Sequence, residues 1–310
     1  MNQATNIFFM GKGGVGKSTA SALNSLFLAQ KGFRVLIVSL DPAHNQSDIF
    51  EKKLSDKPQK ITSNLRAIEI DQDYWIKRYL KDVQKQINRA YSYLTAFNLD
   101  KYFKVVKYSP GLEEYALILV FKDILQKFRD LDFLMFDMPP TALALKFFNL
   151  PTLSLIWIEQ LLVLRQEIIK KRDLITKVKY IKKEVERDKI LNKINEMKQD
   201  YENLKTIFED CDTTHINIVL NPDKLSLAES RRIFEALHDI NIPCSRIINN
   251  KMFPESSCVD ITEAFPDIPL CHCPHSETPL IGLAHLERFL EENEDMVQEQ
   301  VDHLIESCTE

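Results

Sequence analysis

Hydrophobic residues along this chain form short, almost uninterrupted runs that alternate with segments of helical spacing. The runs cover residues 7–10 (IFFM), 34–40 (RVLIVSL), 65–70, 131–136 (LDFLMF), 216–220 (INIVL) and 245–250. Runs of this length are typical of strands buried on both faces of a parallel sheet. Helical patterns such as 18–31 and 226–237 lie between them, the latter with an expected capping box from Ser226 to Glu229. The alternation predicts an α/β fold with an open, mainly parallel sheet and its ligand at the carboxyl ends of the strands.

Residues 73–128 lengthen this alternation and are predicted to form a helical subdomain insertion. The segment 75–107 is rich in aromatic residues, namely Trp75, Tyr79, Tyr91, Tyr93, Phe97, Tyr102, Phe103 and Tyr108. One interpretation is a helical layer that packs on the sheet. The other is part of a hydrophobic groove for a client helix, and the sequence does not separate the two.

Residues 151–210 are predicted to form a charged helical hairpin or coiled-coil-like insertion. Apolar positions in this segment recur in steps of four and three, and 165–193 carries eleven Lys or Arg against five Asp or Glu. A structural insertion, a partner-docking arm and a basic patch for an anionic membrane all fit. The C-terminal segment 287–310 holds nine acids and one base, and we expect a solvated acidic helix there.

Bulk composition excludes several classes of protein. The net charge of −5, without base-reading motifs, gives no reason to expect nucleic-acid binding. No uninterrupted apolar run of 18 residues occurs, so we expect no membrane span, and the first apolar run leads into a glycine loop rather than a cleavage site. The six scattered cysteines are not a secreted disulfide framework, and a cytoplasmic protein of one 310-residue domain is expected.

The glycines gather at one turn. Gly11, Gly13, Gly14 and Gly16 are four of the seven in the chain, and with Lys17 and Ser18 they form a phosphate-loop pattern between a strand and a helix. In such a loop the backbone amides and the helix N-terminus bind phosphate. We expect Lys17 to reach the outer phosphates and the Ser18 hydroxyl to bind Mg²⁺. The predicted nucleotide-binding residues of the loop are Gly11, Lys12, Gly13, Gly14, Val15, Gly16, Lys17, Ser18 and Thr19.

A second lysine, Lys12, lies inside the loop. It cannot easily reach the nucleotide that Lys17 binds, but it can reach across a two-fold axis to the nucleotide of a partner subunit. The loop therefore resembles the deviant phosphate loop of dimeric ATPases, which include partition and division-site ATPases, the nitrogenase iron protein, and arsenite-pump or tail-anchor targeting ATPases. This resemblance predicts a homodimer with Lys12 as a catalytic residue.

The run 34–40 ends in Asp41, at the position where an open α/β sheet holds its chemistry. Asp41 can orient or deprotonate an attacking water, or it can cap the following helix. The string from Asp41 to Phe50, DPAHNQSDIF, resembles the first switch of the ArsA family, which comprises arsenite-pump ATPases and ATPases that target tail-anchored membrane proteins. The resemblance implies that Asp41 positions the catalytic water and that the switch includes Pro42, His44, Asn45 and Ser47.

A second acidic residue, Asp137, follows the run 131–136 and is expected to bind Mg²⁺ through water. The segment DMPPT resembles the second switch of the family, with Asp137, Pro140 and Thr141 retained. Ala142 and Leu143 stand where the family has Gly and His.

The last predicted strand ends in Asn250, and an amide there can pair with an adenine edge. By the family resemblance Asn250 and Pro274 contact the nucleotide base. The family's Cys-x-x-Cys zinc pair is missing, because only Cys258 precedes Cys271 and Cys273. The last two should point the same way on a strand, and structural, metal-binding and redox roles all stay open.

These observations predict an ATPase that uses ATP and Mg²⁺ and acts as a dimeric, nucleotide-driven switch. Three roles are open for it. The favoured one is targeting or chaperoning of hydrophobic segments, with a client helix or membrane-associated protein as partner. The alternatives are the ATPase subunit of an arsenite or antimonite efflux system, and an ATPase for metallocentre maturation or assembly.

Overall fold

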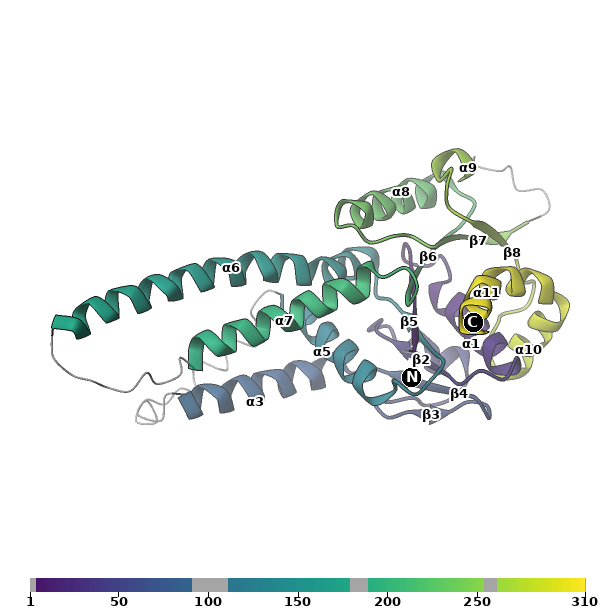
Figure 1. The fold of residues 1–310 in the computed structure, drawn as a ribbon. Helices are drawn as coiled ribbons and strands as arrows, with labels where there is room; N and C mark the ends of the chain where they lie inside the picture. Colours follow the sequence, from purple (N-terminus) through teal and green to yellow (C-terminus); the bar gives the residue numbers. More distant parts are fainter. Residues whose placement is uncertain (1–3, 91–110, 179–188, 254–260, 310) are drawn as a thin grey trace. The chain divides into compact units, whose positions relative to one another are not determined.

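The computed structural model describes residues 4–90, 111–178, 189–253 and 261–309 (Figure 1). Its strands are β1 Thr5–Met10, β2 Val35–Ser39, β3 Gln59–Lys60, β4 Leu65–Glu69, β5 Phe133–Asp137, β6 Thr214–Leu220, β7 Arg246–Met252 and β8 Leu270–Pro274. Its helices are α1 Lys17–Gln30, α2 Asn45–Ile49, α3 Gln72–Ala90, α5 Leu112–Lys127, α6 Thr141–Val178, α7 Lys189–Glu209, α8 Lys224–Asp239, α9 Ile261–Ala264, α10 Leu283–Glu292 and α11 Glu294–Thr309.

The strands form one sheet in the order β3-β4-β2-β5-β1-β6-β7-β8. All neighbouring strands run parallel except β3 and β4. The predicted α/β class and mainly parallel sheet are therefore confirmed. Strand β5 lies between β1 and β2, with Asp137 opposite Phe9 on one side and Ser39 on the other. The carboxyl ends of these three central strands thus meet at one edge of the sheet, which is the edge that bears the candidate site.

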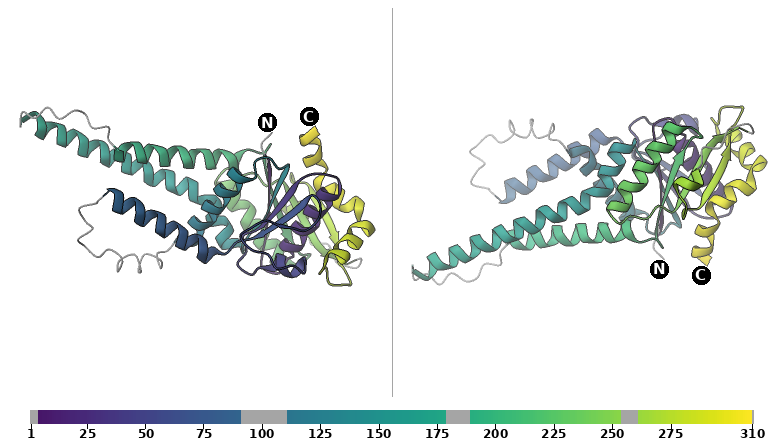
Figure 2. Two further views of the ribbon diagram at one scale, coloured as in Figure 1. Left: turned by 90° about the horizontal axis from the view of Figure 1, so that it is seen from below. Right: turned by 90° about the horizontal axis from the view of Figure 1, so that it is seen from above.

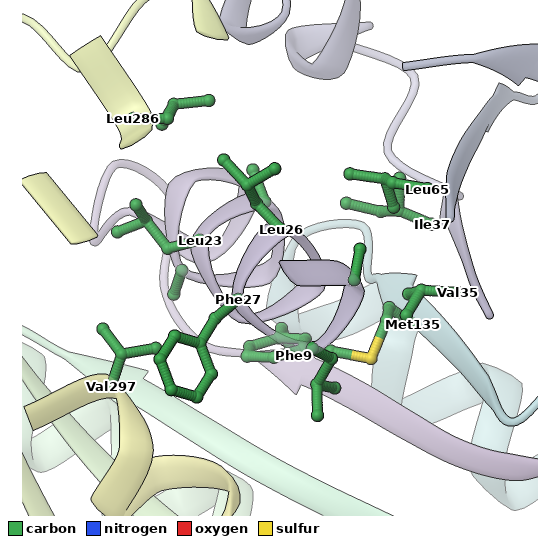
Figure 3. Close-up of a cluster of buried hydrophobic side chains, with 14 of the residues drawn as sticks. Phe9, Leu23, Leu26, Phe27, Val35, Ile37, Leu65, Met135, Leu286 and Val297 are labelled. Carbon is green, nitrogen blue, oxygen red and sulfur yellow. The ribbon is translucent and has the colours of Figure 1, made fainter. Parts of the chain in front are cut away.

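Alternation along β1 sends its side chains into two separate cores. Phe9 faces α1, and this core also includes α10 and α11. Figure 3 shows α1 in the middle of this core, with its own residues Leu23, Leu26 and Phe27. The other labelled side chains lie around this helix, namely Phe9, Val35, Ile37, Leu65, Met135, Leu286 and Val297. Phe8 faces the other way, where its ring stacks on Phe136 at 4.8 Å and lies 5.7 Å from Phe121 of α5. Both faces of the sheet are therefore covered, as the uninterrupted apolar strands require.

The C-terminal segment is not the solvated helix that its acidic composition suggested. It forms two helices, α10 and α11, and Val297, Val301 and Leu304 of α11 are buried in the core that contains α1. The Nδ2 of Asn24 on α1 also donates to the Oε1 of Gln300 at 2.9 Å. The apolar positions of α11 lie three or four residues apart, so one face of the helix is buried and the acids occupy the other.

The segment 73–128, predicted as a helical insertion, contains helices that pack in the core. Within 73–128, α5 is a core helix, since Leu117, Val120 and Phe121 are fully buried. Trp75 of α3 is also buried, and Tyr79 packs on Tyr115 at 4.5 Å, as the sheet-packing interpretation requires. The remaining six aromatic residues of that segment lie outside the described residues.

Residues 148–210 form a compact unit of their own, close to the predicted 151–210 insertion. Helices α6 and α7 lie side by side in Figure 1 and in both views of Figure 2. Phe148 contacts Phe208 edge to face at 5.0 Å, and Tyr201 and Leu204 are buried in the same unit. The predicted apolar seam is therefore buried at its C-terminal end, whereas Ile190 and Met197 of the same seam are exposed.

Helix α6 contains one segment, Thr141–Lys171, that is long and apolar enough to cross a membrane by length and composition alone. Its most apolar 18-residue window has a mean hydropathy of 1.5, and 22% of that window is buried. The expectation of no membrane span therefore stays a prediction. The search for an uninterrupted apolar run missed this segment because isolated polar residues such as Asn149 and Glu159 break the run without lowering its mean hydropathy far. These two criteria alone do not place the helix in a membrane.

Candidate functional site

A pocket of about 610 Å³ lies at the carboxyl edge of the sheet. Its floor is the loop between β1 and α1, and its walls come from the segments that follow β2, β5, β7 and β8. The residues that line it include Gly13, Gly14, Gly16, Lys17, Ser18, Thr19, Asp41, Asn45, Pro140, Asn250, Lys251 and Pro274. The structure therefore brings together the predicted phosphate loop, residues from both predicted switches and the two expected base contacts.

The loop has the backbone angles that only glycine adopts readily. Gly11, Gly14 and Gly16 have positive φ, and a Cβ on Gly16 would lie 2.3 Å from the Nδ2 of Asn250. Helix α1 begins at Lys17, directly after Gly16, so its free N-terminal amides face the pocket. Such an N-terminus favours negative charge and hydrogen-bonds phosphate oxygens.

The two loop lysines differ in their environment. Lys17 is buried, and its Nζ donates to the carbonyl of Lys12 at 3.4 Å. This places the ammonium of Lys17 inside the loop, where a phosphate would replace a weak backbone contact. Lys12 is half-buried and is absent from the residues that line the pocket. Lys12 is therefore not committed to the nucleotide pocket of its own subunit, and its contact with the nucleotide of a partner subunit stays a prediction.

Ser18 lines the pocket, and Asp137 lies buried directly beside it, behind the pocket wall. Asp137 is fully buried, and its Oδ2 accepts from the Nε2 of Gln46 at 3.1 Å. Its Oδ1 is buried and has no hydrogen-bond partner among the described residues. A serine hydroxyl beside a buried carboxylate with an unsatisfied oxygen fits the predicted Mg²⁺ site, because Mg²⁺ prefers oxygen ligands and keeps several waters. Among the described residues no group of three or more His, Cys, Asp or Glu could hold a metal ion, so the expected site depends on Ser18, a single carboxylate and the nucleotide's own oxygens.

Burial raises the pKa of Asp137 to about 6, although hydrogen bonds from Gln46 and Ser18 and the charge of Lys17 act in the opposite direction. A carboxylate whose pKa is higher in the folded than in the unfolded state costs stability once the pH exceeds its unfolded value. The loss develops as the pH rises from the ordinary value of 3.8 to about 6 and is constant above that.

We therefore expect Asp137→Asn to stabilise the nucleotide-free protein, by an amount that grows between pH 4 and pH 7 and reaches on the order of 3 kcal/mol. Urea unfolding of both proteins across that range measures the difference. A difference that does not change with pH would show that Asp137 titrates normally. Asp130→Asn, at an exposed position, serves as the control.

The first predicted switch runs past the same site. Asp41 follows β2 and is buried, with its Oδ1 accepting from the backbone N–H of Ala43 at 3.0 Å. His44 has a left-handed backbone at φ 54° and precedes α2. The Nδ2 of Asn45 donates to the Ser18 hydroxyl oxygen at 3.4 Å, which links the switch to the expected Mg²⁺ ligand. Pro42 and His44 are exposed.

Two residues of this region were missed in the sequence. Glu69, at the end of β4, is buried and accepts from the backbone N–H of Ser47 at 2.7 Å and from the Ser47 hydroxyl. It shares with Asp41 and Asp137 the signal that found them, an acid at the end of an apolar strand. Gln46, fully buried on α2, was given no role among the residues of the switch motif.

The second predicted switch is tied to a different helix. Thr141 begins α6, and its hydroxyl donates to the Oε1 of Glu229 on α8 at 2.9 Å. The expected capping box from Ser226 to Glu229 is therefore wrong. Asp223 caps α8 instead, accepting from the backbone N–H of Ser226 at 2.8 Å. The helix begins one turn earlier than its sequence pattern indicated, which releases Glu229 to bind the switch.

The far end of the pocket is where the base contacts were predicted. Asn250 is buried at the end of β7, and its Nδ2 donates to the carbonyl of Val15 at 2.7 Å. Lys251 follows with a left-handed backbone and donates from Nζ to the carbonyl of Gly14 at 2.9 Å. Asn250 thus braces the phosphate loop in this structure, while its contact with a base stays a prediction, as does that of Pro274.

Three cysteines of the described residues are buried, namely Cys244, Cys271 and Cys273, while Cys211 is exposed. Cys271 and Cys273 lie on β8, both are buried, and His272 between them is exposed, as expected for a strand. Burial raises the pKa of Cys273 to about 12 and that of Cys271 above its ordinary value. Such thiols are protonated and poor metal ligands at neutral pH. Cys258 lies outside the described residues.

Known proteins resemble this chain over most of its length. The model of a family described as anion-transporting ATPase matches residues 4–293. The chain is 27% identical over 299 residues to "Putative arsenical pump-driving ATPase 2" of Aquifex aeolicus, covering 91% of this chain and 96% of that protein. It is 29% identical to the ATPase GET3C of Arabidopsis thaliana, covering 83% of this chain and 69% of that protein. It is 31% identical to an ATPase ASNA1 homolog of Cryptosporidium parvum, covering 80% of this chain and 65% of that protein.

Proposed function

The chain belongs to the anion-transporting ATPase family and is an ATP hydrolase, and we propose that it works as a Mg²⁺-dependent dimeric switch. The observation that carries this proposal is a pocket over a helix N-terminus that is lined by Lys17, Ser18 and Asp41, with the carboxylate of Asp137 buried beside these three side chains. Phosphoryl transfer needs positioning and stabilisation of charge more than it needs covalent chemistry, and these groups supply both.

Each residue has a separate part in the proposed reaction. The loop amides and Lys17 bind the phosphates and stabilise the charge that develops on them. Ser18 and, through water, Asp137 would hold Mg²⁺, which would supply further positive charge to the site when bound. Asp41 orients the attacking water and can accept its proton. Lys12 completes the site of the partner subunit, so that hydrolysis is coupled to dimer closure.

Sedimentation velocity tests the dimeric switch directly. We expect the wild-type protein with Mg²⁺ and a non-hydrolysable ATP analogue to form a tighter dimer than with Mg²⁺ and ADP. Lys12→Ala should bind the analogue with similar affinity but lose the tighter dimer. A wild-type protein that stays monomeric with the analogue bound would contradict the proposal, since Lys12 would have no partner site to enter.

The favoured role of this switch is targeting or chaperoning of hydrophobic segments, and α6 provides the supporting observation. Six large apolar side chains on one stretch of this helix are exposed, namely Leu153, Ile156, Trp157, Leu161, Val163 and Leu164. Monomeric proteins rarely expose that much contiguous apolar surface without a binding partner. We infer that these side chains bind apolar client helices. The same helix begins at Thr141 of the second switch, which provides a covalent connection from the nucleotide pocket to the client surface.

The two tryptophans of the chain allow a direct test. Trp157 is 72% exposed and Trp75 is 6% exposed, so Trp75→Phe leaves an emission that reports on α6 alone. We expect a 20-residue apolar peptide to shift that emission to the blue in the presence of ATP. The matched protein Trp157→Phe, which keeps only the buried tryptophan, should show no shift. An unchanged emission in Trp75→Phe at saturating peptide would contradict the client role but leave the ATPase mechanism in place.

A further inference from the structure

Gln46 is a position of the DPAHNQSDIF segment for which the sequence offered no role. It lies on the single-turn helix α2, between Asn45 and Ser47, and its side chain is fully buried. Its Nε2 lies near three oxygens. These are the carbonyl of Ser18 at 2.9 Å, the hydroxyl of Ser21 at 3.0 Å and the Oδ2 of Asp137 at 3.1 Å.

The orientation of this amide is determined by its neighbours. The Ser18 carbonyl and an ionised Asp137 can only accept hydrogen bonds, so a carbonyl oxygen in place of Nε2 would be repelled by both. The Ser21 hydroxyl donates its own proton to the Ser18 carbonyl at 2.9 Å, which leaves its oxygen free to accept from Gln46. The amide therefore donates one hydrogen towards Asp137 and shares the other between the two serines.

These contacts join parts of the site that are remote in sequence. Gln46 belongs to the first switch, which begins at Asp41. Ser18 belongs to the phosphate loop, and Asp137 ends β5. Asn45 of the same switch reaches only the Ser18 hydroxyl, at 3.4 Å, and Glu69 holds the switch from β4 through Ser47. The Gln46 amide, by contrast, donates directly to one expected Mg²⁺ ligand and to the backbone of the other.

We propose that Gln46 is a positioning residue that couples Mg²⁺ at Ser18 and Asp137 to the conformation of the first switch. The proposal rests on the Mg²⁺-dependent ATPase function proposed above and adds to it the residue that connects metal and switch. When the oxygens of Ser18 and Asp137 are held by the metal, the amide has fixed acceptors and keeps α2 against α1. When the metal leaves with the products, those acceptors are released and the switch loses this attachment.

Linkage makes the proposal measurable in both directions. If Mg²⁺ stabilises the ordered switch, then the ordered switch raises Mg²⁺ affinity by the same factor. Coupling of this kind typically amounts to roughly 5- to 150-fold in affinity. Loss of the Gln46 donor should therefore change the order of the switch and the affinity for Mg²⁺ together, while a purely structural glutamine would change neither selectively.

Hydrogen exchange of peptides that cover residues 41–52 measures the order of the switch. The amides of Phe50, Glu51 and Lys52 donate to carbonyls of Gln46, Asp48 and Ser47, so they report on α2. With a non-hydrolysable ATP analogue bound, we expect Mg²⁺ to slow wild-type exchange here about tenfold. In Gln46→Met, which keeps the side-chain length but has no N–H donor, the effect of Mg²⁺ should fall below about twofold.

Mg²⁺ titration of a fluorescent ATP analogue supplies the second readout. For Gln46→Met we expect the Mg²⁺ concentration at half-maximal effect to rise about tenfold, and kcat to fall about tenfold with KM for ATP within threefold. Gln300→Met is the matched control, because Gln300 is also buried and also hydrogen-bonded through its side chain, but lies on α11 against Asn24. It should behave as the wild type in both readouts.

Two results would overturn the coupling. The first concerns the wild-type protein alone: with the ATP analogue bound, Mg²⁺ does not change the hydrogen exchange of residues 41–52. The other is a folded Gln46→Met protein that keeps both the response to Mg²⁺ and the Mg²⁺ affinity of the wild type. Either result leaves the ATPase function intact, whereas failure of the wild-type protein to bind the ATP analogue would refute the ATPase function and this coupling with it.

Discussion

Replacing Asp41 by Asn is expected to lower kcat for ATP hydrolysis by a factor of about 100 or more, because a positioned general base typically contributes 10²–10⁴-fold. Asn keeps the size of the side chain and the oxygen that accepts from the N–H of Ala43 at 3.0 Å. The turn after β2 should therefore persist. The carboxylate that orients and deprotonates water is lost, while the phosphate loop is untouched. Affinity for ATP should stay within about threefold of the wild-type value, since the interaction removed belongs to the transition state.

Steady-state phosphate release and binding of a fluorescent ATP analogue test the two halves of this expectation. Asp73→Asn, an exposed acid in the first turn of α3, is the matched control and should retain wild-type turnover. If Asp41→Asn hydrolyses ATP at the wild-type rate, then Asp41 only caps the following segment, which is the alternative that the strand-end position alone allowed. If binding and turnover fall together, the substitution has disrupted the pocket rather than the chemistry.

The sheet and its site edge were predictable because their signals are local. An uninterrupted apolar run, a glycine-rich turn and an acid at a strand end each fit within about ten residues. These signals identified Lys17, Ser18 and Asp41, which line the pocket, and Asp137, which is buried beside them. Glu69 carries the same strand-end signal on β4, and only the structure shows that it holds Ser47. The pattern identified the kind of residue, but not which neighbour it binds.

The rest of the site depends on contacts between distant segments, which a sequence pattern does not contain. Thr141 and Glu229 are 88 positions apart, and the capping-box pattern at Ser226 gave Glu229 a local partner that it does not have. Gln46 and Asp137 are 91 positions apart. In α11 the acidic composition suggested solvent exposure, although the spacing of Val297, Val301 and Leu304 was enough to bury one face. In each case tertiary packing decided between two locally acceptable structures.

Gly11→Ala tests the part of the loop where geometry leaves the least freedom. Gly11 has φ +147°, and a Cβ built on it would lie 2.2 Å from the backbone carbonyl oxygen of Val219. That oxygen belongs to β6, which pairs with β1 directly before the loop, so neither partner can move without breaking the centre of the sheet. We expect Gly11→Ala to lower the free energy of unfolding by about 3–5 kcal/mol in the absence of nucleotide, at the upper end of single substitutions.

The matched control lies two residues away in the same loop. A Cβ on Gly13 meets nothing within 4 Å, and Gly13 does not have a positive φ. The free energy of unfolding of Gly13→Ala, measured in urea, should therefore lie within about 1 kcal/mol of the wild-type value, because alanine only slightly restricts the unfolded chain. Equal midpoints for the two variants would show that the loop relaxes away from Val219, and that the close approach to β6 does not fix its shape. A large loss in Gly11→Ala alone would show that the phosphate loop is held by the sheet before any nucleotide binds, so that its amides are already directed at the phosphates when ATP arrives.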